Sequence, residues 1–326
     1  MDPTPIWYGR HPLGLLLLPL SWLYCLVVRL RRLAYRAGWL ASARLPVPVV
    51  VVGNLTVGGT GKTPAVLRLA DLLQARGWTP AIITRGYGGR ASSWPRLVPP
   101  GADPGVFGDE PVLLASRSGC PVVAGPDRAS AARLALDQGG VDVLLADDGL
   151  QHSRLARDIE IVVVDGARGF GNGRCLPAGP LREPKGRMRS VDFVLSNGGD
   201  PCGGHRMELI PGAAVNLRDR SRMRPIADFA GEHVLAVAAI GNPERFFAML
   251  RGLGIAIRPR AYPDHYPFSA SDLAEWPAGP VLMTEKDAVK CARVAGEDHW
   301  YIPVEANLEA AFVDQFFARL EALRNG

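Results

Sequence analysis

Short apolar runs alternate along the chain with stretches whose apolar residues recur at helical spacing. Residues 141–146 and 159–164 are runs of strand length that are apolar except for one acidic residue each, the pattern of strands buried on both faces of a parallel sheet. After residue 64, by contrast, apolar positions recur every three or four residues, as on one face of a helix. Strands that alternate with helices predict an α/β fold, a parallel sheet with helices on both of its faces.

The same pattern divides the chain into parts. Residues 166–189 form a long stretch rich in Gly, Pro and Arg, and loops of that length are usually functional or mobile. A second α/β unit begins with the apolar run at 233–239. We therefore expect an N-terminal segment at 1–45, a larger α/β domain at 46–225 and a smaller C-terminal α/β domain at 226–326.

The strand predicted at 49–52 runs into a glycine-rich loop, and residues 49–63 read VVVVGNLTVGGTGKT. Such a P-loop points backbone N–H groups at a polyphosphate, while its lysine reaches the outer phosphates and its final hydroxyl reaches Mg²⁺. The strict pattern requires glycine in place of Thr56, but Gly58 and Gly59 supply the backbone freedom. The predicted phosphate-binding residues are Thr56, Val57, Gly58, Gly59, Thr60, Gly61, Lys62 and Thr63.

Two adjacent carboxylates, Asp147 and Asp148, end the apolar run that begins at residue 141. In a nucleotide-binding sheet this edge faces the phosphates, and a carboxylate there holds Mg²⁺ directly or through water. A helix N-cap at a strand exit is the alternative use of such an aspartate. Because a phosphate loop lies upstream, we predict that both carboxylates, together with the hydroxyl of Thr63, form a metal site. His152 follows closely, and its role stays open between structural and functional.

Further charged residues stand in predicted loops and at a helix start. Asp109 and Glu110 begin a predicted helix, where a cap and a first-turn acid are the alternative interpretation. Arg182 and Glu183 lie in the long loop, which can bring a cation over a transferring phosphoryl group. His265 stands between two prolines and is therefore displayed on a stiff turn.

Composition and charge narrow the class of protein. The 326 residues are 48% hydrophobic, which is enough to form a substantial core in about two domains. Five scattered cysteines without a CxxC pair indicate neither a disulfide framework nor a zinc site. The formal charge of +5 equals that of residues 1–45, which contain six arginines and one aspartate. The rest of the chain is neutral, so we expect no nucleic-acid partner.

The basic N-terminus also contains an uncharged apolar run at 12–28, which Arg29, Arg31, Arg32 and Arg36 follow. A membrane span usually needs about 20 apolar residues, so this run suits an interfacial helix at least as well as a span. The arginines would then lie among anionic headgroups on the cytoplasmic side. A cleaved signal peptide and burial against the protein's own core are the alternatives. We expect this segment to attach the chain to a membrane without being needed for its chemistry.

Eight segments, in this order and spread over nearly the whole chain, resemble the tetraacyldisaccharide 4'-kinase family of bacterial lipid A kinases. They are GNLTVGGTGKTP (53–64), TRGYGG (84–89), GDEP (108–111), DDGLQH (147–152), PAGPLRE (177–183), AIGNPERFF (239–247), PDHYPF (263–268) and TEKDAVK (284–290). Thr56 is normal in the loop of this family. The family's N-terminal membrane-associating helix matches residues 12–28.

The resemblance implies that the chain uses ATP and Mg²⁺ to phosphorylate the 4'-hydroxyl of a disaccharide 1-phosphate lipid at the cytoplasmic face of the inner membrane. Its implied partners are this lipid and the anionic membrane surface, and no protein partner is indicated. Asp109 matches the family's proposed catalytic base and His265 its partner, and the two meet only if the two units close over the substrate. The full set of implied catalytic residues is Lys62, Asp109, Arg182, Glu183 and His265.

Two other interpretations are weaker. A membrane-tethered regulatory ATPase uses a related loop, KGGxGKT, whose first lysine reaches across a dimer, and Val57 stands at that position here. A soluble small-metabolite kinase with the same loop has no use for the apolar and basic residues at 12–36.

Overall fold

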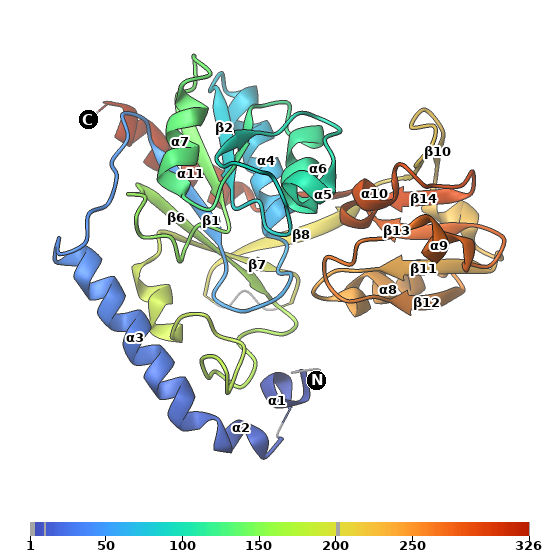
Figure 1. Cartoon of the computed structure of the whole chain (residues 1–326), viewed down its shortest axis with the longest axis horizontal. Coiled ribbons are helices and arrows are strands. Elements are labelled where there is room, and N and C mark those ends of the chain that lie inside the picture. Colours follow the sequence, from blue (N-terminus) through green and yellow to red (C-terminus); the bar gives the residue numbers. More distant parts are fainter. Residues whose placement is uncertain (1–3, 10, 200–202, 326) are drawn as a thin grey trace.

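The computed structural model describes residues 4–9, 11–199 and 203–325, and its strands form two sheets in two units that lie side by side (Figure 1). Within these residues the larger sheet has nine strands in the order β15-β8-β7-β6-β1-β5-β2-β4-β3, and the smaller sheet has six in the order β10-β9-β14-β13-β11-β12. Cys202 lies outside the described residues.

The larger sheet is parallel except at its edges. β1 pairs in parallel with β5 and β6, whereas the edge strands β3 and β15 are antiparallel to their neighbours. Every residue of β1, β2 and β5 is buried, as the continuous apolar runs predict. Its strands are β1 (Val49–Gly53), β2 (Pro80–Thr84), β3 (Arg96–Leu97), β4 (Val122–Ala124), β5 (Val143–Asp147), β6 (Ile159–Asp165), β7 (Phe193–Asn197), β8 (His205–Pro211) and β15 (Val304–Leu308).

Helices cover both faces of this sheet, which confirms the predicted fold class. Because side chains alternate along a strand, Val50 and Val52 of β1 pack with one set of helices, and Val49 and Val51 pack with α7 on the other face. The helices of the first set are α4 (Lys62–Ala75), α6 (Asp109–Arg117) with the short α5 (Pro104–Phe107) before it, and α11 (Ala310–Asn325); α7 is Arg128–Leu136.

The smaller sheet has its own apolar core, in which Phe229 and Trp300 pack edge to face. Its strands are β9 (Ala214–Asn216), β10 (Met223–Arg224), β11 (Val234–Ala238), β12 (Ile257–Ala261), β13 (Val281–Thr284) and β14 (His299–Ile302). Its helices are η2 (Ile226–Phe229), α8 (Pro243–Gly252), α9 (Ala270–Ala274) and α10 (Glu285–Cys291).

The boundaries expected at 46–225 and 226–326 are wrong on two counts. β9 and β10, which precede residue 226, pair within the smaller sheet. β15 and α11, by contrast, return to the larger unit, where Phe312 and Phe316 are fully buried beside Phe193. The physical reason is that strand pairing and aromatic packing, rather than position in the sequence, decide which core a terminal segment completes.

The N-terminal residues form α1 (Thr4–Tyr8), α2 (Leu13–Leu16) and α3 (Leu18–Arg36). α3 lies along the loop at 166–190, which ends in the 3₁₀ helix η1 (Lys185–Ser190). One face of α3 contacts this loop: the Ser21 hydroxyl donates a hydrogen bond to the carbonyl of Cys175, and the Tyr24 hydroxyl donates one to the carbonyl of Arg182.

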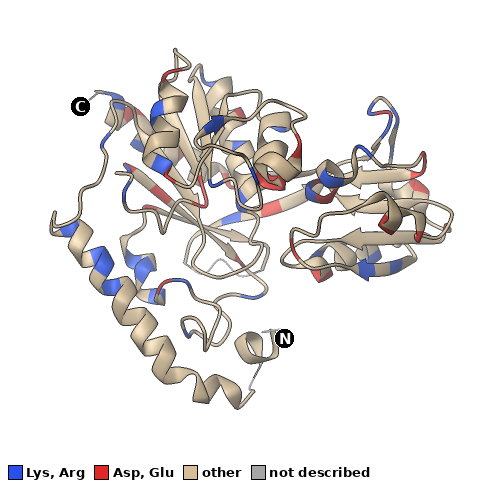
Figure 2. Cartoon of the chain, viewed as in Figure 1, with Lys and Arg blue, Asp and Glu red and all other residues tan. Residues whose placement is uncertain are grey.

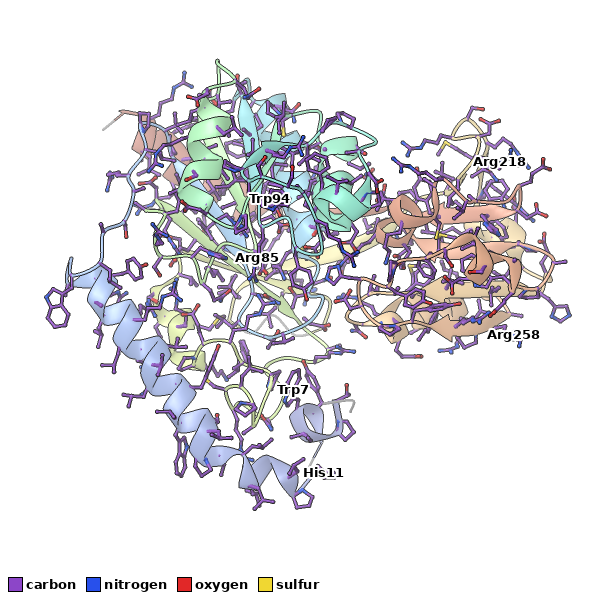
Figure 3. All side chains as sticks on the ribbon, in the orientation of Figure 1. Trp7, His11, Arg85, Trp94, Arg218 and Arg258 are labelled. Atoms are coloured by element: carbon purple, nitrogen blue, oxygen red, sulfur yellow. The ribbon has the colours of Figure 1, made fainter. Side chains whose placement is uncertain are left out.

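The opposite face of α3 is apolar and exposed. Side chains along α3 project away from the rest of the molecule (Figure 3), and the half of α3 that precedes the arginines carries no charge (Figure 2). In the part of the chain that the structure describes, no helix is long and apolar enough to cross a membrane. The exposed apolar residues of this region are Leu15, Leu16, Leu20, Trp22, Leu23, Leu26, Val27, Leu30, Leu33, Trp39 and Leu40.

Candidate active site

The phosphate loop connects β1 to the N-terminus of α4, which begins at Lys62. Gly61 adopts φ +95°, and a Cβ there would lie 2.4 Å from Nδ2 of Asn197, so glycine is required on both counts. Asn197 in turn donates a hydrogen bond of 2.8 Å to the Thr60 carbonyl. No side chain caps α4 in the described structure, so the N–H groups of its first turn are available to an anion.

The first two residues of the predicted loop make a different contact. Thr56 is bridged to Leu181, and the Val57 N–H donates to the carbonyl of Pro180 at 2.8 Å. The start of the phosphate loop is therefore attached to the long loop that follows β6. The N–H of Val57 is occupied by this contact, which leaves the residues from Gly58 to Thr63 to surround a phosphate.

Asp148 lies between two cations. Lys62 Nζ is 3.5 Å from Oδ1 of Asp148, and Nη1 of Arg182 donates to both oxygens of Asp148 at 3.0 and 2.9 Å. Burial works to raise the pKa of Asp148, but the charges of Lys62 and Arg182 hold it well below its usual range. The structure thus brings together three residues that the sequence places far apart.

Asp147, at the end of β5, is 1% exposed, and its Oδ1 has no hydrogen-bond partner among the described residues. Burial, followed by the nearby charge of Glu110, raises the pKa of Asp147 to about 7. An orphaned buried carboxylate oxygen beside a phosphate loop suits a divalent cation. Among the described residues no three His, Cys, Asp or Glu side chains cluster as a metal site, and Mg²⁺ bound to a nucleotide needs only one or two carboxylates.

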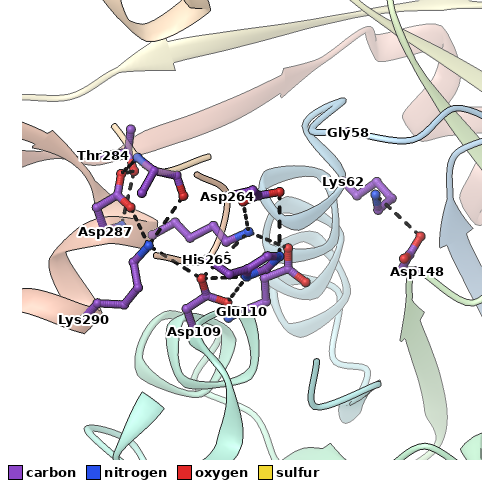
Figure 4. Close-up of polar contacts among 12 residues, drawn as sticks. Gly58, Lys62, Asp109, Glu110, Asp148, Asp264, His265, Thr284, Asp287 and Lys290 are labelled. Carbon is purple, nitrogen blue, oxygen red and sulfur yellow. Dashed lines mark hydrogen bonds and ion pairs between the residues drawn. The ribbon is translucent and has the colours of Figure 1, made fainter. Parts of the chain in front are cut away.

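Asp109 and His265 meet at the junction of the two units (Figure 4). Nδ1 of His265 lies 2.9 Å from both carboxylate oxygens of Asp109, which is 4% exposed. Burial disfavours the charged form of both residues. Their hydrogen bond nevertheless raises the pKa of His265, and the same hydrogen bond, followed by the charge of Lys286, lowers the pKa of Asp109. The imidazole also packs against the ring of Tyr87, at a centroid distance of 4.8 Å.

Glu183 makes its contacts away from this centre. Its Oε1 accepts a hydrogen bond of 2.9 Å from Gln151, and its Oε2 lies 3.4 Å from Nε of Arg187. Arg187 also pairs with Glu160 of β6. Of the two loop residues predicted to be catalytic, Arg182 reaches Asp148 beside Lys62, whereas Glu183 contacts Gln151 and Arg187.

Arg128, at the start of α7, was not predicted from the sequence. It is 2% exposed, and only its Nη1 is bonded, to the Gly125 carbonyl at 2.7 Å; Nε and Nη2 have no partner among the described residues. It lines a cavity of about 300 Å³ together with His152. Burial lowers the pKa of Arg128 to about 10. Burial of the imidazole, together with the charge of Arg128, lowers the pKa of His152 to about 4. The sequence signal that could have revealed Arg128 is its position directly after a helix N-cap, Asp127, which itself follows a strand.

A phosphate loop, a strand-end carboxylate pair and a carboxylate–imidazole pair define a P-loop phosphotransferase. The family model described as tetraacyldisaccharide-1-P 4'-kinase matches residues 13–321, and the chain belongs to this family. It is therefore an ATP-dependent kinase of a lipid A pathway family, which confirms the resemblance stated from the sequence.

Relatives and a solved structure agree with this assignment. The chain is 52% identical to the tetraacyldisaccharide 4'-kinase of Alkalilimnicola ehrlichii, over 100% of both chains. It is 50% identical to that of Nitrosococcus oceani, over 97% of this chain and 93% of the relative. A crystal structure of the "apo" form of LpxK from Aquifex aeolicus in complex with ATP matches with a TM-score of 0.78 and 30% identity, over 94% of this chain and 99% of that one.

Proposed function

We propose that the chain transfers the γ-phosphoryl group of ATP to the 4'-hydroxyl of a tetraacyldisaccharide 1-phosphate, with Asp109 and His265 as the proton-accepting pair. The observation that carries this proposal is the contact of 2.9 Å between them, which joins the two units beside the phosphate loop. In the reaction the hydroxyl proton moves to the Asp109 carboxylate, the hydroxyl oxygen bonds to the γ-phosphorus, and ADP leaves.

His265 orients the base. Its Nδ1 donates a hydrogen bond to the Asp109 carboxylate, so a lone pair of that carboxylate stays directed at the substrate hydroxyl. The imidazole shares the positive charge of the proton that the carboxylate accepts. His265 has φ +61°, a strained backbone for a residue with a side chain, and such strain is typical of functional sites.

Lys62 and the N–H groups from Gly58 to Thr63 hold the phosphates, and Lys62 neutralises charge on the outer ones. Thr63 and Asp147 are the protein ligands that would fit Mg²⁺, because Oδ1 of Asp147 has no hydrogen-bond partner among the described residues. A cation held there would supply neutralisation of phosphate charge. The metal role expected for Asp148 stays a prediction; its carboxylate pairs with Lys62 and Arg182 and so also helps to position these two cations.

Arg128 offers two unpaired nitrogens to an anionic group of the substrate. Its side chain is rigid because it is buried, and the cavity beside it is roomy enough for a phosphate or a sugar hydroxyl. The 1-phosphate of the proposed lipid is the anionic group that this arginine suits.

The exposed apolar face of α3 is the proposed attachment to the cytoplasmic face of the inner membrane. A lipid substrate requires the site to approach a bilayer, and the apolar face followed by arginines provides the two signals that stable attachment needs. Large exposed apolar patches of this kind mark interaction surfaces.

The test of the proposed function is ATP consumption by the purified full-length protein with and without the lipid disaccharide 1-phosphate. We expect turnover only with the lipid, and a product that carries one additional phosphate at the 4'-position. Equal ATP hydrolysis in the absence of the lipid would favour the regulatory ATPase instead.

A further inference from the structure

Lys286, near the start of α10, lies among three carboxylates from two other segments. Its Nζ is 3.0 Å from Glu110 Oε1, 3.4 Å from Asp264 Oδ1 and 3.9 Å from Asp109 Oδ2. Asp109 and Glu110 begin α6 of the larger unit, whereas Asp264 belongs to the turn of the smaller unit that carries His265. The ammonium group of Lys286 therefore contacts both the start of α6, which carries Asp109, and the turn that carries His265.

Lys290 follows one helical turn later and is held differently. Its Nζ lies 2.7 Å from Asp287 Oδ1, 3.9 Å from Asp109 Oδ2 and 5.2 Å from the centroid of the Phe268 ring. Asp287, which is fully buried, also accepts hydrogen bonds from Thr284 and from the N–H of Ala239. Lys290 is thus anchored within its own unit and adds only a distant charge at Asp109.

The hydrogen bond from His265, followed by the charges of Lys286 and Lys290, keeps the buried Asp109 carboxylate ionised; the charged groups that face it have both signs. These charges are positive on Lys286 and Lys290 and negative on Glu110, Asp264 and Asp287, with His265 between them. Burial works to lower the pKa of Lys286, but Glu110, Asp109 and Asp264 raise it above its usual range, so this lysine stays charged.

We infer that Lys286 is a positioning residue for the phosphoryl transfer, an inference that rests on the proposed function. Lys286 connects the Asp264–His265 turn to α6. It thereby keeps the Asp109 carboxylate ionised and in contact with His265. It touches neither substrate nor nucleotide in this role. The turn needs such a restraint because His265 holds a left-handed backbone, and its own N–H makes only a contact of 3.3 Å with the Ala239 carbonyl.

The experiment compares three variants of the full-length enzyme by the pH dependence of kcat. Lys286→Met should lower kcat by about 10-fold or more, because the positioned base supplies a large part of the rate, with KM for ATP little changed. The acid limb of its pH profile should move to higher pH, since losing a positive neighbour raises the pKa of Asp109. Lys286→Arg should restore most of the activity. Arg293→Met is the matched control, because it breaks an exposed pair with Asp103 that also joins the two units.

A second comparison separates positioning from simple neutralisation of Glu110. If Lys286 only neutralises Glu110, the double variant Lys286→Met with Glu110→Gln should recover the pH profile of Lys286→Arg, and the inference would be overturned. If Lys286 positions the pair, the double variant should stay as impaired as Lys286→Met. Should Lys286→Met fail to fold, Lys286→Gln, which keeps a hydrogen-bond donor without the charge, replaces it in both comparisons.

A measurement that needs no lipid tests the role of Lys286 separately from the proposed function. The imidazole of His265 is titrated by NMR in the wild-type protein and in Lys286→Met, with its signal assigned from His265→Gln. We expect the pKa of His265 to fall when Lys286 is removed, because the hydrogen bond to Asp109 that raises it is loosened; a rise would mean that only the charge of Lys286 acts on the pair, and would overturn the positioning role. An unchanged titration overturns the role of Lys286, whereas a wild-type protein that is inactive on lipid but shows the shift overturns only the proposed function.

Discussion

Lys62 has one polar contact that the structure defines, its ion pair with Asp148 beside the phosphate loop (Figure 4). Lys62→Ala should lower kcat by about 100-fold or more, because a group that stabilises charge in the transition state is lost. Steady-state assays at saturating ATP measure this. Near-normal turnover would remove the phosphate-loop assignment.

Asp109 and His265 should behave as one unit in kinetics. Asp109→Ala and His265→Ala should each lower kcat by about 100-fold or more with little change in ATP binding, and the double variant should be scarcely worse than the more damaging single variant. A double-mutant cycle measures the coupling. If Asp109 acts only as a helix cap, its loss should instead cost about 1 kcal/mol of stability, and the kinetic effects should add.

Arg128 should show opposite effects on stability and on activity. Arg128→Met removes a buried charge that lacks full compensation, so the melting temperature should stay the same or rise. KM for the lipid should rise by about 10-fold or more, because charge-assisted hydrogen bonds to an anion are lost. Arg154→Met is the comparison, since Arg154 lines the same cavity but is exposed. Equal effects of the two variants would argue against a specific role for Arg128.

At the scale of elements, α3 does more than provide an apolar surface. Its inner face bonds to the carbonyl of Arg182, whose side chain holds Asp148, so the helix supports the loop that shapes the active site. This contact argues against the expectation that the N-terminal segment is dispensable for chemistry. Deletion of residues 1–40 should therefore impair the enzyme both in bilayers and in detergent.

Single substitutions on α3 should separate the two roles. Tyr24→Phe removes the hydrogen bond to the Arg182 carbonyl and should lower kcat by about 3-fold or more on lipid in vesicles and in detergent micelles alike. Leu26→Ser, on the exposed face, should lower activity on vesicles alone, because only membrane attachment is weakened. A purely membrane-attaching helix would instead make Tyr24→Phe silent in detergent.

At the scale of the whole molecule, a second contact joins the smaller unit to the phosphate loop. Arg245 of α8 donates to Oδ1 of Asn197 at 2.6 Å, and Asn197 holds the Thr60 carbonyl. Arg168 also reaches across, to Asn242 and to the Gly241 carbonyl. The position of the smaller unit is thereby linked to the shape of the phosphate loop as well as to the catalytic pair.

Arg245→Met should raise KM for ATP by about 3-fold or more, because Asn197 loses the partner that orients its amide toward Thr60. Arg251→Met, on the same helix but in an exposed pair with Glu244, should leave KM unchanged. Isothermal titration with a non-hydrolysable ATP analogue checks both. Equal affinities for wild type and Arg245→Met would show that the two units are not linked through this contact.

The sequence by itself determined the local features of this protein. Continuous apolar runs identified the buried strands, and the glycine-rich stretch ending in Lys62 and Thr63 identified the phosphate loop, because both depend on neighbouring residues only. The ordered motifs were enough to identify the family, and through it the pairing of Asp109 with His265.

Apart from that pair, only the tertiary structure decided which distant residues share a site. Lys286 lies 176 positions from Glu110 and yet contacts it, and β15 with α11 returns to the larger sheet, because these contacts depend on how the cores pack. For the same reason Arg182 reaches Asp148, while its neighbour Glu183 turns to Gln151. Burial likewise gave Arg128 and Asp147 their unpaired atoms, since no sequence pattern records which polar atoms lose their water on folding.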